Sequence, residues 1–309
     1  MQIGRYDSRR KYFDGVGTEI SGCQKSEQAI KLAGLDFEVE KQPIYLADGT
    51  VIDRKFANVR TDTNEVLGVV GENYNIVQNK DGFEFLDSII GTDCVYETAG
   101  SLRGGRTSFM LAKTEPIKIL GDDFDPYMLF TNSFDGSGTV QAMFTPIRVY
   151  CSNTLALALK NAENKISIKH ASNVKDELEI AKQTLLLNSK YLENLKQVSE
   201  QLAVTPFNES QVDKAVHELI PIKLDSTDNR IEKQERAQQE FWNAYNQDDL
   251  QNYNNSALKF IQAVADYDSH KQPGRITGND AYTMLRVVGG MLLLNQAAQI
   301  VRKQTGVRF

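Results

Sequence analysis

The sequence predicts an α+β protein, with a curved antiparallel sheet and one inserted helix in the first half and helices in the second. Between residues 36 and 150, short apolar runs with a period of two are separated by turn residues. Later in the chain, apolar residues recur at helical spacing within long polar segments. We therefore expect an N-terminal segment (1–35), a sheet-rich α+β domain (36–170) and a helical region (171–309).

Turn signals in the first half set the expected strands. Asp48-Gly49 favours a tight hairpin turn, because glycine adopts the left-handed conformation without steric cost. Gly104-Gly105 and the segment 135–138 mark two further turns. The strands joined by these turns are expected over residues 36–40, 43–46, 51–59, 65–70, 94–102, 106–113, 127–134 and 139–150.

Two helices are expected around this sheet. Residues 78–90 carry apolar side chains at helical spacing, and Asn79 is the expected N-cap. Residues 26–35 predict a short helix with Ser26 as its N-cap. An acidic loop is expected at Asp122, Asp123 and Asp125.

The helical region shows several amphipathic segments. Ser210 is the expected cap of the segment that carries Val212, Val216 and Leu219 on one face. Val287 to Ala298 is nearly all apolar, which is typical of a helix buried in a core or a subunit interface. Helices are expected over residues 151–163, 175–202, 205–220, 228–245, 255–267 and 279–303.

Composition excludes several classes of protein. The chain has 309 residues, of which 41% are hydrophobic and 25% charged, so it is neither disordered throughout nor a disulfide-stapled miniprotein. With 35 basic and 41 acidic residues the formal charge is −6, which excludes a uniformly basic nucleic-acid coat. The composition is still compatible with a local basic surface.

The rare residues and the apolar runs indicate a cytoplasmic protein without a cofactor. The chain starts with a polar, basic segment, and no apolar run approaches the 20 or so residues of a membrane span. Its three cysteines are scattered, as expected for a reducing compartment. No metal-binding motif surrounds the three histidines, so neither a metal nor another cofactor is expected.

Four segments resemble a known family. Residues 67–79 have the sequence LGVVGENYNIVQN, and residues 255–270 have the sequence NSALKFIQAVADYDSH. Residues 131–137 (TNSFDGS) and 148–155 (RVYCSNTL) add a strand–turn and a strand–helix junction. Together these segments are similar to the phage- and plasmid-like proteins of the family called domain of unknown function 932, over roughly residues 35–300.

The resemblance implies a bacterial phage or mobile-element setting. In the late helix the family typically has Trp where this chain has Leu258, and Asn where it has Gln262, which indicates a diverged member. The expected architecture, a curved antiparallel sheet with packed helices, also resembles phage single-strand annealing proteins at the level of fold.

The charge is unevenly distributed. Residues 61–130 hold 5 basic and 12 acidic residues, whereas residues 131–200 hold 8 basic and 7 acidic residues. A local basic groove on an acidic body is the electrostatic pattern of a selective binder of single strands, and tyrosines can stack on bases. The candidate nucleic-acid contacts are Arg54, Lys55, Arg60, Tyr74, Arg103, Arg106, Arg148, Lys160, Lys165 and Lys169.

A structural interpretation of the same residues stays open. Lysine and arginine on strands commonly protect sheet edges from pairing with other strands. The loop amides Asn73, Asn75 and Asn79 are accounted for by turn formation and helix capping.

We expect a non-enzymatic protein that binds single-stranded DNA and promotes annealing as a homo-oligomer. The alternative is an interaction protein that binds a host factor, such as an inhibitor of bacterial defence, through its acidic surface. A metal-dependent nuclease is a third alternative, disfavoured because no converging set of acidic ligands is visible in the sequence.

Overall fold

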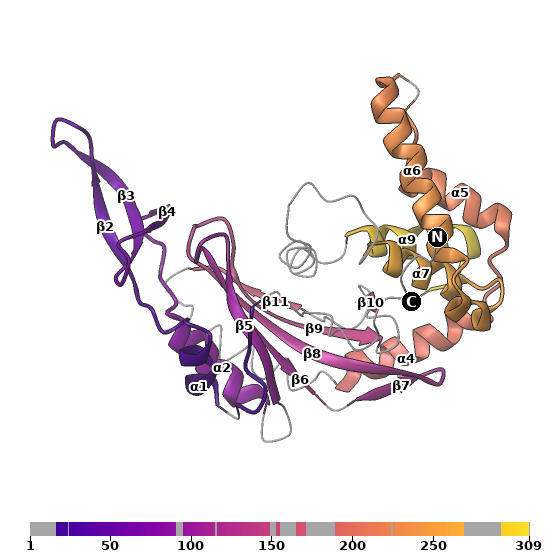
Figure 1. Ribbon diagram of the computed structural model, residues 1–309, viewed down its shortest axis with the longest axis horizontal. Coiled ribbons are helices and arrows are strands. Elements are labelled where there is room, and N and C mark those ends of the chain that lie inside the picture. The colour runs from indigo at the N-terminus through magenta and orange to yellow at the C-terminus, as the bar shows by residue number, and fades with distance from the viewer. Residues whose placement is uncertain are drawn as a thin grey trace, which may run out of the picture.

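The computed structural model confirms the α+β class: antiparallel sheets occupy the first half of the chain and helices the second (Figure 1). The structure describes residues 17–23, 25–90, 95–114, 116–148, 153–154, 165–170, 189–223, 225–268 and 292–308.

The larger sheet has eight antiparallel strands. Its central order is β5-β6-β8-β9, with β1 beside β5, β7 beside the start of β8, and both β10 and β11 beside β9. The strands are β1 (Thr18–Glu19), β5 (Val95–Leu102), β6 (Thr107–Lys113), β7 (Ile117–Ile119), β8 (Asp122–Ser133), β9 (Val140–Arg148), β10 (Asn153–Thr154) and β11 (Lys165–Ile168).

Helices α1 (Ser26–Leu32) and α2 (Asn79–Ile90) lie side by side against this sheet (Figure 1). The ring of Phe83 in α2 meets Phe130 of β8 edge-on, with 5.3 Å between centroids. A side chain at Gly82 would lie 3.0 Å from Phe130, so glycine permits this close approach.

The expected caps of these two helices are wrong. Lys25, not Ser26, is the N-cap of α1, because the backbone N–H and hydroxyl of Ser26 both donate to Asp87 in α2. Asn79 uses its side-chain amide to donate to the carbonyl oxygen of Leu35 at 3.0 Å. Both polar side chains therefore form tertiary hydrogen bonds instead of capping their helices.

A second, smaller sheet contains β2 (Val39–Tyr45), β3 (Val51–Arg60) and β4 (Val66–Gly71) in the order β2-β3-β4. The predicted meander is thus confirmed, and Gly49 has the left-handed φ of +87° that its turn requires. The sequence suggested one continuous sheet, but this meander forms its own sheet, which projects from the larger one (Figure 1).

The helical region is organised around α7, whose residues are all buried. Helices α4, α6 and α9 and the 3₁₀ helix η1 contact it. The expected cap at Ser210 is wrong, because Asn208, two residues earlier, is the N-cap and forms a reciprocal capping box with Gln211. The elements are α4 (Ser189–Val204), α5 (Glu209–Leu219), α6 (Asp228–Tyr245), η1 (Asp248–Tyr253), α7 (Ala257–Asp266) and α9 (Leu292–Thr305).

Some expected loops are strands. Asp122, Asp123 and Asp125 lie on β8, where Lys118 pairs with Asp123 and Lys113 pairs with Asp125. Strand β11, expected as irregular chain, pairs with β9. Of the helix expected over 151–163, the structure describes only residues 153–154, which form a strand.

No helix in the described ranges is long and apolar enough to cross a membrane. Within those same ranges, no three or more His, Cys, Asp or Glu side chains gather as a metal ion would need.

Candidate nucleic-acid interface

One end of the eight-stranded sheet gathers several of the predicted basic residues. Leu102, Thr107 and Ser133 lie side by side across β5, β6 and β8, and Ile168 of β11 faces Val140 of β9. The β5–β6 turn (103–106), the β8–β9 turn (134–139) and residues 169–170 therefore share this end. We call it the junction, together with the residues of the smaller sheet and its following loop (58–75) that touch it.

The β5–β6 turn presents two arginines. Arg103, Gly104 and Gly105 all have positive φ angles, of +53°, +68° and +88°. The left-handed conformation at Arg103 is unusual for a residue with a side chain, and it is the kind of backbone strain that clusters at functional sites.

The two arginines differ in their partners. The Nη2 atom of Arg103 donates to the Thr107 hydroxyl at 2.8 Å, and its Nη1 atom lies 3.6 Å from Asp135. The side chain of Arg103 is still 46% exposed. Arg106 is exposed and, in the part of the chain that the structure describes, has no acidic partner. Its carbonyl accepts a hydrogen bond from the Phe134 N–H, which fixes the turn against β8.

Asp135 organises the β8–β9 turn. Its carboxylate accepts hydrogen bonds from the Ser133 hydroxyl and from both the N–H and the hydroxyl of Ser137. Partial burial opposes ionisation, but these hydrogen bonds and the charge of Arg103 outweigh it and hold the pKa of Asp135 below its usual value. The turn therefore carries a fixed negative charge beside Arg103.

The smaller sheet is fastened to this turn. The buried Asn58 on β3 donates its side-chain amide to the carbonyl oxygen of Phe134 at 2.6 Å. A side chain at Gly68 on β4 would lie only 2.5 Å from the Asp135 Cα atom, so the two backbones cross in direct contact. A side chain at Gly105 would likewise lie 3.1 Å from the Arg60 guanidinium. The junction thus depends on close backbone approach.

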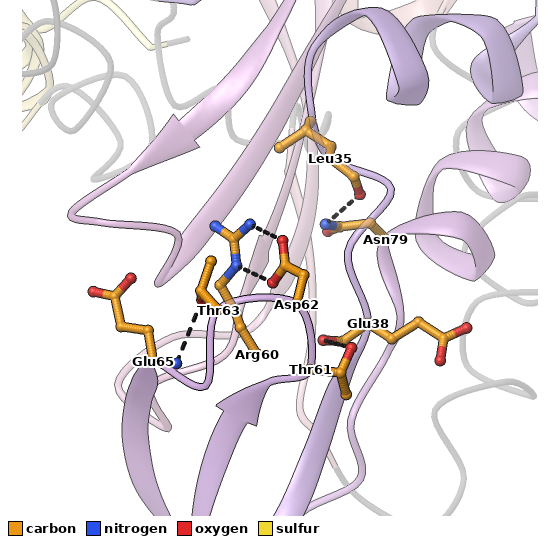
Figure 2. Close-up of polar contacts among 8 residues, drawn as sticks. All are labelled: Leu35, Glu38, Arg60, Thr61, Asp62, Thr63, Glu65 and Asn79. Atoms are coloured by element: carbon orange, nitrogen blue, oxygen red, sulfur yellow. Dashed lines mark hydrogen bonds and ion pairs between the residues drawn. The ribbon is translucent and has the colours of Figure 1, made fainter.

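Arg60 is a structural residue rather than an open contact. Its guanidinium lies 3.9 Å from the Phe37 ring centroid and forms two hydrogen bonds with Asp62, at 3.0 and 2.7 Å (Figure 2). Only 17% of its side chain is exposed. Figure 2 also shows the Thr61 hydroxyl, which donates to the Glu38 carbonyl oxygen, and the Glu65 N–H, which donates to the Thr63 hydroxyl.

Tyr74 is also held by the protein. Its hydroxyl donates to the carbonyl oxygen of Ser133 at 2.6 Å, and its ring stacks on His170 with 4.5 Å between centroids. Burial, followed by the nearby charge of Asp135, raises the pKa of Tyr74. Its ring therefore joins the loop after β4 to the end of β11.

His170 completes this connection. Its Nδ1 atom lies 3.0 Å from the Asn75 carbonyl oxygen, and its own carbonyl accepts from the Asn75 N–H at 3.1 Å. Burial lowers the pKa of His170, although the hydrogen bond with Asn75 opposes this effect. Burial in this contact therefore disfavours the protonated imidazole of His170.

A family model for domain of unknown function 932 (DUF932) matches residues 66–298, about three quarters of the chain. The chain belongs to this family. The matched range starts at β4 and includes both turns of the junction, the Tyr74 loop and His170. No curated protein and no solved structure matches the chain.

The DUF932 chain does not bring all the predicted contacts together. Arg103, Arg106 and the exposed Lys169 lie at the same end of the sheet, within the junction, together with the enclosed Arg60 and Tyr74. Arg54 and Lys55 lie further out on β3. Arg148 pairs with Phe124 and Asn153 at the opposite end of β9, and Lys165 lies along β9 beside Met143. Lys160 lies outside the described residues.

Several residues that build the junction were not singled out from the sequence. Asn58 and Asn132 are completely buried in strands, although asparagine is unfavourable there. Asn132 donates its side-chain amide to the Val77 carbonyl oxygen at 2.7 Å. In the sequence, these are two asparagines at inward-facing positions of predicted strands. A buried amide needs a hydrogen-bond partner, so such positions indicate a contact with the backbone of another segment.

Proposed function

We propose that this DUF932 protein binds single-stranded DNA at the junction, without catalysing a reaction on it, and promotes annealing in a phage or mobile-element setting. The observation that carries the proposal is the β5–β6 turn. There, a strained backbone holds Arg103 and Arg106 at the same sheet end as the exposed Lys169.

The electrostatics favour a local contact with phosphate. Arg106 and Lys169 are exposed, and within the described residues neither has an acidic partner that a phosphate would have to displace. The 3.6 Å separation of Arg103 from Asp135 is longer than a strong charge-assisted hydrogen bond, so its guanidinium can turn towards an anion. Phosphate contacts of this type give binding with little dependence on sequence.

We expect stacking of tyrosine on DNA bases to contribute little to binding at this site. Tyr74 was a candidate stacking residue, but one face of its ring is against His170 and its hydroxyl is bonded to Ser133. We therefore assign recognition to the cations, and we place Tyr74 and Arg60 in the framework that positions them.

The test measures binding of a fluorescently labelled 30-nucleotide single strand by anisotropy over a range of salt concentrations. We expect the pair Arg103→Ala and Arg106→Ala to weaken binding at 50 mM salt on the order of tenfold. Their removal should also lower the slope of log affinity against log salt by about 1.4, because each phosphate contact contributes about 0.7.

The matched control is Lys118→Ala, which removes an exposed lysine of β7 that pairs with Asp123 of β8, away from the junction. It should leave both affinity and slope unchanged. Absence of binding by the unmodified protein at 50 mM salt, or equal losses in the two variants, would refute the proposal.

The interaction-protein alternative is favoured by the 12 acidic against 5 basic residues over residues 61–130. A pull-down from bacterial lysate that returns one stoichiometric protein and no nucleic acid would support this alternative instead.

A further inference from the structure

The outer part of the β2–β3 hairpin is an arm without a core. We define the arm as residues 42–55, which include the end of β2, the turn and the first half of β3. None of these residues is buried. Figure 1 shows β2 and β3 projecting away from α1, α2 and the larger sheet.

Large apolar side chains lie at the outer end of this arm. Tyr45, Leu46 and Val51 are 58%, 52% and 52% exposed. A two-stranded hairpin is marginally stable in water unless a further layer covers it. Tyr45 and Val51 are partners across β2 and β3, and paired exposed apolar side chains on a projecting element point to an interaction site.

The backbone of the arm is irregular where its charges lie. The β2–β3 register shifts between Pro43 and Tyr45, so that extra residues of β3 bulge out opposite Ile44. Arg54, in this bulge, has a φ of +56°, which is unfavourable for any residue except glycine. Its side chain is 74% exposed, with only a 3.8 Å ion pair to Glu72. Packing among the residues that the structure describes does not account for this strained conformation.

The charges of the arm favour a protein partner over a polyanion. The arm carries Asp48 and Asp53 against Arg54 and Lys55, so its net charge is zero. A nucleic acid would need a positive excess at this position. Two copies of the arm, in contrast, can align so that acidic residues of one face basic residues of the other.

We propose that the arm packs against the arm of a second copy of this chain. Such a contact is isologous, because the same surface serves on both sides of a two-fold axis. Tyr45, Leu46 and Val51 supply the apolar centre, and the four charges set the relative orientation. The inference rests on the proposed annealing function, for which the sequence predicts a homo-oligomer, and it leaves the junction cations uncovered.

The first test measures the mass of the full chain, treated with nuclease, by light scattering at 0.15 and 0.5 M salt. We expect the unmodified protein to have at least twice the chain mass of 34.7 kDa at both salt concentrations. The pair Tyr45→Ser and Leu46→Ser should reduce it to 34.7 kDa. Leu32→Ser, at an apolar residue of α1 that is 62% exposed, is the matched control and should leave the mass unchanged.

The second test exchanges the charges. The pair Arg54→Glu and Lys55→Glu makes the arm strongly acidic, whereas Asp53→Lys makes it basic. Asp48 is retained because its carboxylate accepts the Thr50 N–H that closes the turn. Each variant alone should associate less than the unmodified chain, and an equimolar mixture should regain the unmodified mass.

A monomeric unmodified protein, or an unchanged mass in the Tyr45→Ser and Leu46→Ser variant, would overturn the inference. Unchanged mass with weakened binding of the labelled single strand would assign the arm to DNA instead. Because the Arg103 and Arg106 variant tests DNA binding separately, failure of the arm contact and failure of DNA binding give different results.

Discussion

The junction and the arm lie at opposite ends of the same strand, β3, and the chain stabilises them in opposite ways. At the junction end, Val59 is 5% exposed and Asn58 is completely buried against Phe134. At the arm end, Val51 is 52% exposed. One strand therefore passes from a packed polar contact to a surface that no described residue buries.

The comparison shows two uses of polar and apolar residues. Asn58 and Asn132 are buried because their amides donate to backbone carbonyls of distant segments, and the bond of Asn58 to Phe134 fixes how the two sheets meet. The arm keeps exposed apolar residues, which the larger sheet does not cover. We infer that the first region sets geometry within one chain and that the second region acts between chains.

The largest expected effect comes from breaking the junction at Gly68. Gly68→Ala would place a Cβ atom 2.5 to 2.8 Å from backbone atoms of Asp135, so the β8–β9 turn must move away from β4. That movement would also disturb the Asn58 and Tyr74 hydrogen bonds. We expect a loss of about 3 kcal/mol in the free energy of unfolding, measured by urea denaturation.

Gly71→Ala is the matched control on the same strand. A Cβ atom there meets nothing within 4 Å, so we expect its effect to stay within about 0.5 kcal/mol. Equal midpoints for the two variants would show that the close crossing at Gly68 does not matter for stability.

A smaller effect is expected from pH, through His170. Burial lowers the pKa of His170 from 6.5 in the folded protein, so the unfolded chain binds this proton more readily. The contribution of His170 to the free energy of unfolding should therefore be at its maximum above about pH 6.5. It should fall as the pH drops below that value, by at most about 1.4 kcal/mol per pH unit.

His170→Phe tests the assignment, because it retains a ring against Tyr74 but cannot be protonated. Urea denaturation between pH 5 and 7.5 should give a flatter profile for this variant than for the unmodified protein. Since Asp135 titrates below its ordinary value of 3.8, it does not contribute in this pH range. If the free energy of unfolding changes with pH in the same way in both proteins, His170 is not the cause of the pH dependence.

The sequence predicted local features better than contacts between distant segments. The β2–β3–β4 meander, helix α2 and the paired glycines of the β5–β6 turn were predicted because their signals lie within a few residues. The caps at Ser26 and Ser210 were wrong because neighbouring polar residues compete for the same role, and Asp87, 61 residues away, decides for Ser26.

The candidate site was predicted in part for the same reason. The sequence shows basic residues on and between the predicted strands, and Arg103 and Arg106 are among the predicted contacts. Arg60 is enclosed by Phe37 and Asp62. Its contact with Phe37 depends on the tertiary fold, so no local sequence pattern predicts it. Pairing of the aspartates of β8 with Lys113 and Lys118 likewise requires the register of neighbouring strands.

The smallest expected effect comes from the arm, at Val51. In a dilute, monomeric sample, Val51→Ser should change the free energy of unfolding by less than about 0.5 kcal/mol, because the side chain already meets water. Val59→Ser, on the same strand but buried, should cost about 2 kcal/mol because it loses apolar burial and places a hydroxyl in the core.

Protein concentration then separates the two regions. If arms pair, the unmodified protein gains apparent stability by mass action as its concentration rises, and Val51→Ser should lose that gain. Val59→Ser should lower stability by the same amount at every concentration, because its contacts lie within one chain. Thermal unfolding at 1 and 100 µM measures both effects. A Val51→Ser protein whose stability still rises with concentration like the unmodified chain would place the contact between copies elsewhere than on the arm.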